Sequence, residues 1–279
     1  MEILSQYYHG LDVWDIGTAT HSDLYQGLFE YQASAIMEFL CLHGAYCNGT
    51  TFRTQLEPLL KVFGAGKDHK FTFVNGAFEM DPPVGSKEFF GTAPHHRFFP
   101  FHVTNILNSV RRCPKVLSPG RLLDYVKEEV GQEAFTEAVD GLMTMLAEHP
   151  SVTGLIGYSE GAMAAATMIM EEERRQRTDS RPRQIKGAIF FAGWPPVAET
   201  DYLGLGTEAE VEVEVVDVPT FHVIGSGDPF VEASMTLYRV CAEDTAELFD
   251  HGQGHMMPRE MKTLKELSDA LDQFVDGLE

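Results

Sequence analysis

Residues 154–170 read GLIGYSEGAMAAATMIM, and three structural elements are expected to follow one another directly in this stretch. A short apolar segment leads to Ser159, which stands between Gly157 and Gly161, and a run rich in Ala and Met follows. The apolar segment is typical of a buried strand, and the Ala-rich run is typical of a helix that packs closely on a sheet. We therefore expect a strand, a tight turn at Ser159 and a helix.

Similar apolar segments recur along the chain and alternate with helical patterns. Apolar spacing indicates helices over 121–148, where Gly131 and Gly141 are placed to bend or divide the helix, and over 258–278, after Pro258. Strands are expected within the ranges 36–44, 69–76, 151–158, 185–194, 218–228 and 245–252. This alternation predicts an α/β fold with a mostly parallel sheet and helices on both faces.

The sequence shows no internal repeat, no low-complexity tract and no linker between separate domains, so we expect residues 36–279 to form one domain. Residues 75–114 are rich in Pro, Gly, Phe and His, which predicts a loop-rich insertion over one rim of the sheet. Residues 1–35 precede the first predicted strand and form an N-terminal extension.

Charge and composition exclude several function classes. The chain carries 42 acidic residues against 21 Lys and Arg, and a strongly acidic protein repels polyphosphates, so we expect no nucleic acid partner. No apolar run approaches the roughly 18 residues needed to cross a bilayer, and the first residues lack the basic and apolar parts of a secretion signal. The four cysteines form no CxxC pair, which is typical of a reducing compartment such as the cytoplasm.

Six basic residues nevertheless gather in one stretch, RRQRTDSRPRQIK. We favour a solvated helix end and loop for this stretch, and the alternative is a docking patch for an acidic partner. The basic residues are Arg174, Arg175, Arg177, Arg181, Arg183 and Lys186.

Gly157-Tyr158-Ser159-Glu160-Gly161 matches the pattern G-x-S-x-G, in which a serine occupies a strained turn between a strand and a helix. Side chains at the two glycine positions would collide with the neighbouring strand or helix. The pattern alone is common, but here it follows an apolar segment and opens a helix. We therefore expect Ser159 to be a nucleophile.

A serine hydroxyl is a weak nucleophile at neutral pH, so the pattern requires a carboxylate and a histidine base at the ends of later strands. Asp228 follows the segment TFHVIG, and His255 follows AELFDHG, in the order Ser, acid, His. Asp250 and Asp244 are the alternative acids. Ser159, Asp228 and His255 together predict a catalytic triad.

Two backbone N–H groups are expected to form an oxyanion hole. One belongs to Glu160, directly after the nucleophile, and the other to Ala45 or Tyr46 in the segment LHGAYCNG.

Other residues that could suggest a site have simpler explanations. His95, His96 and His102 lack nearby carboxylates at metal-ligand spacing, so we expect loop or pocket-lining residues and no metal site. The methionines of the run after Ser159 are expected on the buried face of their helix, in the protein core.

The segments FLCLHGAYCNGTTFRTQLEPL, GLIGYSEGAMAAA, IFFAGWPP and PTFHVIGSGDPFV, together with DHGQGHMMP, resemble a fungal family of small serine hydrolases with the α/β-hydrolase fold. The resemblance covers residues 36–258 and implies Ser159 as nucleophile, Asp228 as acid and His255 as base. That family includes stand-alone thioesterases that release polyketide chains from an acyl carrier protein. Its elbows often read G-F-S-Q-G, so Tyr158 and Glu160 are departures, and Glu160 places a carboxylate beside the predicted oxyanion hole.

Three hypotheses follow from these patterns. The first is a thioesterase acting on a carrier-bound polyketide or related acyl chain, the second a carboxylesterase acting on a free small ester, and the third a binding protein that has kept the fold and lost turnover. Neither enzyme would need a metal or an organic cofactor. The residues expected to line an apolar acyl pocket are Tyr158, Phe98, Phe99 and Trp194.

Overall fold

The computed structural model describes residues 36–65, 67–86, 90–101, 124, 127–197 and 216–278. The chain divides into two units, Met1–Ala35 and Ile36–Glu279, and every described residue belongs to the second. The predicted N-terminal extension therefore lies outside the described residues, as does the part of the predicted loop region from residue 102 to 114.

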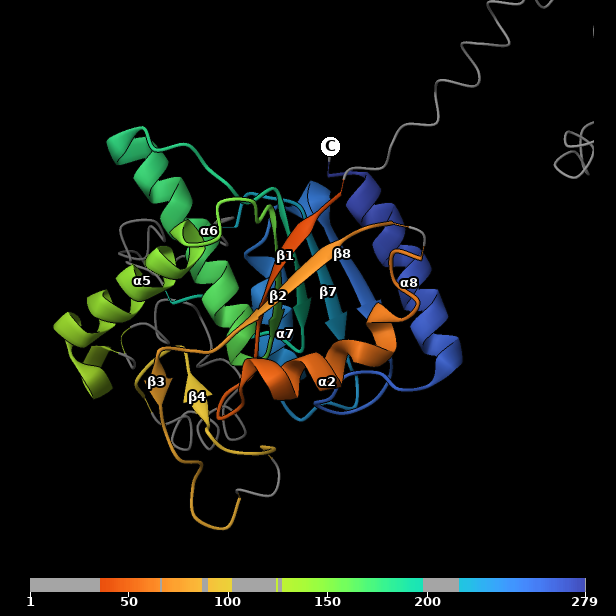
Figure 1. The fold of residues 1–279 in the computed structure, drawn as a ribbon, viewed down its shortest axis with the longest axis horizontal. Helices are drawn as coiled ribbons and strands as arrows, with labels where there is room; N and C mark the ends of the chain where they lie inside the picture. The colour runs from red at the N-terminus through yellow and green to blue at the C-terminus, as the bar shows by residue number, and fades with distance from the viewer. Residues whose placement is uncertain are drawn as a thin grey trace, which may run out of the picture. The chain divides into compact units, whose positions relative to one another are not determined.

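Six strands form one sheet in which each neighbouring pair is parallel, as predicted (Figure 1). Their spatial order is β2-β1-β5-β6-β7-β8. Because all six run in one direction, their carboxyl ends meet at the same edge, where sites of open α/β sheets form. The strands are β1 (Glu38–Leu42), β2 (Lys70–Val74), β5 (Gly154–Tyr158), β6 (Gly187–Phe191), β7 (Thr220–Ile224) and β8 (Ala246–Asp250).

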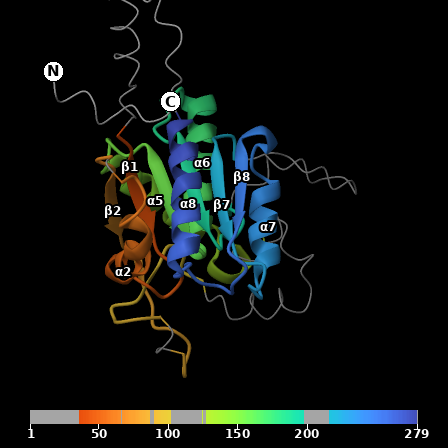
Figure 2. The ribbon, with the colours of Figure 1, turned by 90° about the vertical axis from the view of Figure 1, so that its right-hand side faces the viewer.

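Helices cover both faces of this sheet. Figures 1 and 2 show α2 (Gly49–Leu60) and α8 (Met261–Asp276) on one face, with α5 (Gln132–Ala147) and α6 (Glu160–Asp179) on the other. The buried apolar side chains of α7 (Val231–Arg239), Ala233 and Leu237, belong to the same apolar cluster as those of α5 and α6. The expected three-layer arrangement is therefore present.

The two apolar clusters alternate along the central strands. In β1, Leu40 and Leu42 contribute to the cluster under α5 and α6, whereas Phe39 and Cys41 contribute to the cluster under α2 and α8. Successive side chains of a strand point to opposite faces, so a strand covered on both sides is apolar throughout. Burying one such side chain contributes about 2 kcal/mol.

Helix α2 was not predicted from the sequence. Asn48 caps it: the backbone is extended and the side-chain oxygen accepts the N–H of Thr51 at 2.8 Å. Its apolar positions Phe52, Leu56 and Leu59 lie on one buried face. The cap and this face together account for the helix.

The helix predicted over 121–148 is divided at Gly131, one of the two glycines expected to bend or divide it. Residues 127–130 are helical, Gly131 has a φ of 84°, and α5 begins at Gln132. Gly141 lies inside α5 without interrupting it.

The loop-rich segment contains a small second sheet. Strands β3 (Phe78–Glu79) and β4 (His96–Arg97) pair antiparallel there, and the backbone of His96 also bridges to that of Cys47. These contacts bring the segment against the loop after β1.

In the part of the chain that the structure describes, no helix is both long and apolar enough to cross a membrane. Three of the four cysteines, Cys41, Cys47 and Cys241, are buried, and Cys113 lies outside the described residues.

Candidate active site

Ser159 occupies the turn between β5 and α6 with a φ of 54° and a ψ of −114°. A non-glycine residue in this region is strained and persists only where its surroundings fix it. The N–H of Ser159 donates to the carbonyl of Phe191 in the neighbouring strand at 2.9 Å. The strain and this anchor are typical of a nucleophile elbow.

The two glycines of the elbow are needed for space. A Cβ atom at Gly157 would lie 2.5 Å from the backbone nitrogen of Ala162, and one at Gly161 would collide with the backbone oxygen of Leu42 at the end of β1. The steric reason expected from the spacing therefore holds at both positions.

Ser159, His255 and Asp228 form a continuous hydrogen-bonded series. Nε2 of His255 lies 3.0 Å from Oγ of Ser159, and Nδ1 lies 2.7 Å from Oδ2 of Asp228. An ionised carboxylate only accepts, so Nδ1 carries the proton and Nε2 accepts from the serine hydroxyl. The structure thus brings the three residues together in the geometry of a general base next to a nucleophile.

Asp228 is held firmly at the end of β7. Its side chain is 1% exposed against 24% for that of His255, and its second oxygen accepts the N–H of Phe230 at 2.7 Å. A carboxylate fixed in this way can orient the imidazole ring while the ring stays accessible from the site.

The alternative acids lie elsewhere. Oδ1 of Asp250 accepts the N–H groups of Ser226 at 2.9 Å and Gly252 at 2.7 Å, so it stabilises the turn after β8. Asp244 belongs to a short 3₁₀ helix, Glu243–Thr245, before β8. Of the three carboxylates considered, Asp228 is the one bonded to His255.

Aromatic rings surround the base. The ring of Phe230 lies 5.4 Å from that of His255 at 84°, and the ring of Tyr158 lies 5.4 Å away at 35°. Trp194 packs on Phe230 with 6.0 Å between ring centroids. Two of the predicted pocket residues, Tyr158 and Trp194, therefore lie on the His255 side of the site.

The other two predicted pocket residues, Phe98 and Phe99, are buried in the core, in the same apolar cluster as Trp194. Phe98 is 1% exposed and Phe99 is 0% exposed, and both belong to the cluster under α5 and α6. Phe98 also packs on the ring of His43 with 4.7 Å between centroids. The Phe98 ring therefore supports the loop after β1, and the Phe99 ring packs on that of Phe101 with 6.0 Å between centroids.

His43 fixes the loop that holds the predicted oxyanion donors Ala45 and Tyr46. Its Nδ1 lies 2.7 Å from the carbonyl oxygen of Gly44, and its Nε2 accepts the N–H of Gly76 at 3.0 Å. Burial lowers the pKa of His43 to about 4, so the ring is neutral and serves as one donor and one acceptor. This histidine was not singled out in the sequence, although the HG pair after a strand marks its position.

Tyr46 itself has a φ of 54°, the same unusual value as Ser159. Its side chain is fully buried, and the turn around it is closed by the N–H of Cys47, which donates to the carbonyl of Gly44 at 3.2 Å. The first N–H groups of a helix lack intrahelical acceptors, which applies to Glu160 at the start of α6. Both predicted donor segments thus lie beside the elbow.

The carboxylate of Glu160, the unexpected residue of the elbow, is engaged by the loop-rich segment. Nε of Arg97 donates to Oε2 at 2.7 Å, and Oε1 accepts the N–H groups of Phe98 at 3.0 Å and Phe99 at 3.2 Å. Both charged side chains are buried, at 0% and 3% exposure. Arg97 was not identified from the sequence. The only signal for it was Glu160 itself, because an acidic residue in an apolar elbow requires a partner.

The predicted loop histidines also have defined partners. Nδ1 of His95 lies 3.0 Å from the carbonyl oxygen of Tyr46, and the N–H of His96 donates to the carbonyl of Cys47 at 2.8 Å. His102 lies outside the described residues. No group of three His, Cys, Asp or Glu side chains among the residues that the structure describes is placed to hold a metal ion.

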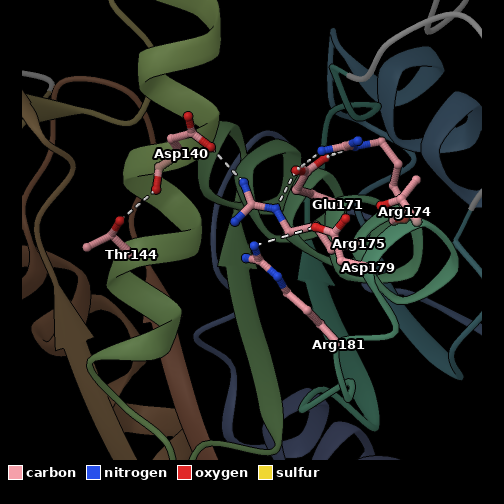
Figure 3. Close-up of polar contacts among 8 residues, drawn as sticks. Asp140, Thr144, Glu171, Arg174, Arg175, Asp179 and Arg181 are labelled. Atoms are coloured by element: carbon pink, nitrogen blue, oxygen red, sulfur yellow. Dashed lines mark hydrogen bonds and ion pairs between the residues drawn. The ribbon is translucent and has the colours of Figure 1, made fainter.

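The predicted basic stretch pairs with carboxylates of the chain. Figure 3 shows Arg175 between Glu171 on its own helix and Asp140 of α5. Its nitrogens lie 2.6 Å from a carboxylate oxygen of each. Arg174 binds Glu171 through two nitrogens at 2.7 Å. Burial raises the pKa of Glu171, but the hydrogen bonds from both arginines outweigh it and hold the pKa below its ordinary value.

The remaining arginines of that stretch follow the same pattern. Arg177 pairs with Glu173 at 2.8 Å, and Arg183 pairs with Asp217 through two nitrogens. Arg181 lies 3.5 Å from Asp179, and Figure 3 draws this ion pair. The positive charge of the stretch is therefore largely matched within the chain.

Comparisons with known proteins agree with this geometry. A model of the serine hydrolase (FSH1) family matches residues 33–267. Esterase FPY3 of Fusarium mangiferae is 27% identical over 245 residues, which cover 86% of this chain and 97% of the relative. Thioesterase FSL2 of Gibberella zeae is 24% identical over 261 residues, which cover 88% of this chain and 95% of the relative.

Among solved structures, Zea mays acyl-protein thioesterase 2 is similar with a TM-score of 0.52 at 15% identity, over 88% of this chain and 96% of that one. At this identity the likeness shows the fold. The prediction of an α/β-hydrolase fold is confirmed.

Proposed function

Because the chain belongs to the serine hydrolase (FSH1) family, we propose that it cleaves an ester or thioester bond through an acyl-enzyme on Ser159. The observation that carries this proposal is the position of His255, whose two ring nitrogens lie 3.0 Å from Oγ of Ser159 and 2.7 Å from Oδ2 of Asp228. A base held between a nucleophile and an orienting carboxylate performs acyl transfer on several unrelated folds.

In the first half of the reaction, Nε2 of His255 takes the proton of the Ser159 hydroxyl while Oγ attacks the carbonyl carbon. The tetrahedral intermediate collapses, the protonated imidazole gives its proton to the departing alcohol or thiol, and an ester on Ser159 remains. Water then attacks this ester with His255 again as base, and the acid product leaves. Asp228 holds the ring in the required tautomer throughout.

The oxyanion of each tetrahedral intermediate would be stabilised by backbone N–H groups of Glu160 and of Ala45 or Tyr46. Donors fixed in this way stabilise charge that develops only in the transition state. Every step in this scheme uses groups of the chain and water.

For the substrate, we propose a polyketide-type acyl chain delivered as a thioester by an acyl carrier protein, in secondary metabolite biosynthesis. The support is the resemblance of the elbow and of the His255 segment to a family that includes such thioesterases, together with the relative named Thioesterase FSL2. We further propose a cytoplasmic location, since the four scattered cysteines form no CxxC pair, as is typical of a reducing compartment.

A second candidate is a carboxylesterase acting on a free small ester. The ion pairs of the basic stretch favour it, because arginines already matched by Glu171, Glu173 and Asp217 offer little charge to an acidic carrier. The two candidates differ in the leaving group. Hydrolysis of one acyl chain as its N-acetylcysteamine thioester and as an oxygen ester would distinguish them by kcat/KM.

The proposal is tested with a fluorophosphonate probe, which labels only an activated serine. We expect wild type to label and to hydrolyse p-nitrophenyl butyrate, Ser159→Ala to do neither, and the control Ser226→Ala, in the exposed turn after β7, to do both. Folded wild type that neither labels nor turns over any ester would instead support the binding protein hypothesis.

A further inference from the structure

Arg97 connects two segments of the candidate site that are far apart in the chain. Its Nε donates to Oε2 of Glu160 at 2.7 Å, and its Nη1 donates to Oη of Tyr46 at 3.3 Å and to the carbonyl of Phe101. The guanidinium group also lies 4.8 Å from the ring centroids of both Tyr46 and Phe101. One fully buried side chain therefore contacts both segments at once.

These two segments carry the predicted oxyanion donors. Glu160 is the first residue of α6, and Tyr46 lies in the loop after β1. The strands before them, β5 and β1, pair directly, and Arg97 adds a side-chain connection beyond the ends of these strands. A guanidinium group is planar, with nitrogens in a fixed fork, so it sets the distance between two partners more rigidly than a lysine ammonium would.

The strand β4 that carries Arg97 is attached on both sides in the same way. On the side of the β1 loop, Nδ1 of His95 lies 3.0 Å from the Tyr46 carbonyl oxygen, and the N–H of His96 donates to the Cys47 carbonyl. On the side of the elbow, Oε1 of Glu160 accepts two consecutive backbone N–H groups that follow Arg97. The segment that carries Arg97 is therefore hydrogen-bonded to both donor segments.

The contacts of Arg97 also bear on the strained backbone of Tyr46. Its φ of 54° is one that a tyrosine adopts only where its surroundings over-determine it. The hydrogen bond and the stacked guanidinium of Arg97 are contacts that hold the side chain of Tyr46, and hence its backbone, in place.

We propose that Arg97 is a positioning residue that acts through Glu160 and Tyr46 to hold the two sides of the oxyanion hole at their working distance. This inference rests on the proposed function, since it presumes that an oxyanion forms on a substrate of Ser159. Misplaced donors weaken binding of the transition state and leave binding of the ground state unchanged, so kcat falls while KM stays.

A purely structural ion pair would behave differently. Its loss would lower the folded fraction or the melting temperature, but each remaining active site would turn over at the normal rate. Turnover per active site, counted by titration with a fluorophosphonate, therefore separates the two roles.

Glu172 offers a matched control on the same helix. Its buried carboxylate also accepts two consecutive backbone N–H groups, from Gln184 at 2.8 Å and Ile185 at 3.1 Å. Glu172→Gln thus removes a comparable buried charge that has no contact with the oxyanion segments.

The experiment measures kcat and KM for p-nitrophenyl butyrate, per titrated site, together with the inhibition constant of a trifluoromethyl ketone. That inhibitor forms a tetrahedral adduct whose oxygen takes the place of the oxyanion. We expect Arg97→Met and Glu160→Gln to lower kcat about 10- to 100-fold. KM should stay within about threefold, and the inhibition constant should rise by a factor similar to the loss of kcat. Glu172→Gln should leave all three unchanged.

Arg97→Lys covers the case in which Arg97→Met does not fold, because lysine keeps the charge and loses the fork. Lysine should also lower kcat, since one ammonium group does not reach both partners in the same geometry. A kcat per titrated site within about threefold of wild type in the folded Arg97 variants would overturn the inference alone. A wild type that does not label would contradict the proposed function and the inference with it.

Discussion

The hydroxyl group of Tyr158 donates a hydrogen bond to the backbone carbonyl of His255 at 3.1 Å. Burial raises the pKa of Tyr158, so its hydroxyl stays protonated and remains a donor. The residue directly before Ser159 therefore holds the loop of the base, and a substitution there tests whether this tie matters for turnover.

Tyr158→Phe removes this hydrogen bond and keeps the ring contact. We expect the free energy of unfolding to fall by about 1 kcal/mol, because the carbonyl loses its partner. We expect kcat to fall less than tenfold, since Asp228 still orients the imidazole ring. Urea unfolding and steady-state kinetics measure the two effects. Unchanged values of both would show that the bond is dispensable.

Asp228→Asn and Asp250→Asn form a pair that tests the assignment of the acid. Asparagine at position 228 favours the wrong tautomer of His255, and we expect kcat to fall about 10⁴-fold, the size of the effect in comparable triads. Asp250 accepts two backbone N–H groups and no histidine nitrogen, so its variant should lose stability and keep kcat within about tenfold. The reverse ranking of kcat would assign the acid to Asp250.

Gly161→Ala and Gly141→Ala test the close approach at the elbow. A Cβ atom at Gly161 would collide with the Leu42 backbone, so we expect a loss of several kcal/mol in unfolding free energy and of labelling at Ser159. Gly141 lies in α5 with nothing near its Cβ position, and alanine there should stabilise by about 0.5–1 kcal/mol. Melting temperatures measure the change in stability of both variants. A Gly161→Ala protein as stable as wild type would contradict the close packing at the elbow.

The pH dependence of stability should reflect two buried histidines. Burial lowers the pKa of His43 to about 4 and that of His222 to about 3, whereas the ordinary value is 6.5. Between the folded and the unfolded pKa of each histidine, the unfolded chain binds a proton that the folded chain does not. The stabilisation that comes from keeping both rings neutral is therefore complete above pH 6.5 and is lost as the pH falls toward 4.

We therefore expect the unfolding free energy, measured in urea from pH 7 to pH 4.5, to decline as the pH falls. Removing the titration with His222→Gln should reduce the slope by roughly 1 kcal/mol per pH unit. Identical slopes for wild type and variant would mean that His222 is not the neutral, buried group described.

The sheet and the triad could be predicted because their signals are local or follow chain order. Apolar runs bounded by glycines located the six strands, and the order Ser159, Asp228, His255 placed each triad residue after a strand of one parallel sheet. Helix α2 was missed since Gly, Thr and Pro give its segment GTTFRTQLEPLL a low helix propensity. Its stability depends on the Asn48 cap and on the sheet beneath it.

The partner of Glu160 could not be predicted for a different reason. Arg97 lies 63 residues away in the chain and in a loop-rich segment, where no periodicity indicates a contact. The same limit applies to Phe98 and Phe99, because an aromatic loop residue has the same composition whether it lines a pocket or fills a core. The fold buries both rings and places that of Phe98 against His43 in the loop after β1.

The central claim is that hydrolysis passes through an ester on Ser159, and intact-mass spectrometry of an acid-quenched reaction with p-nitrophenyl acetate tests it most directly. We expect wild type to gain the mass of one acetyl group, located by peptide mapping at Ser159, and Ser159→Ala to gain none. Turnover by wild type with no adduct at Ser159, or with an equal adduct in Ser159→Ala, would contradict the account.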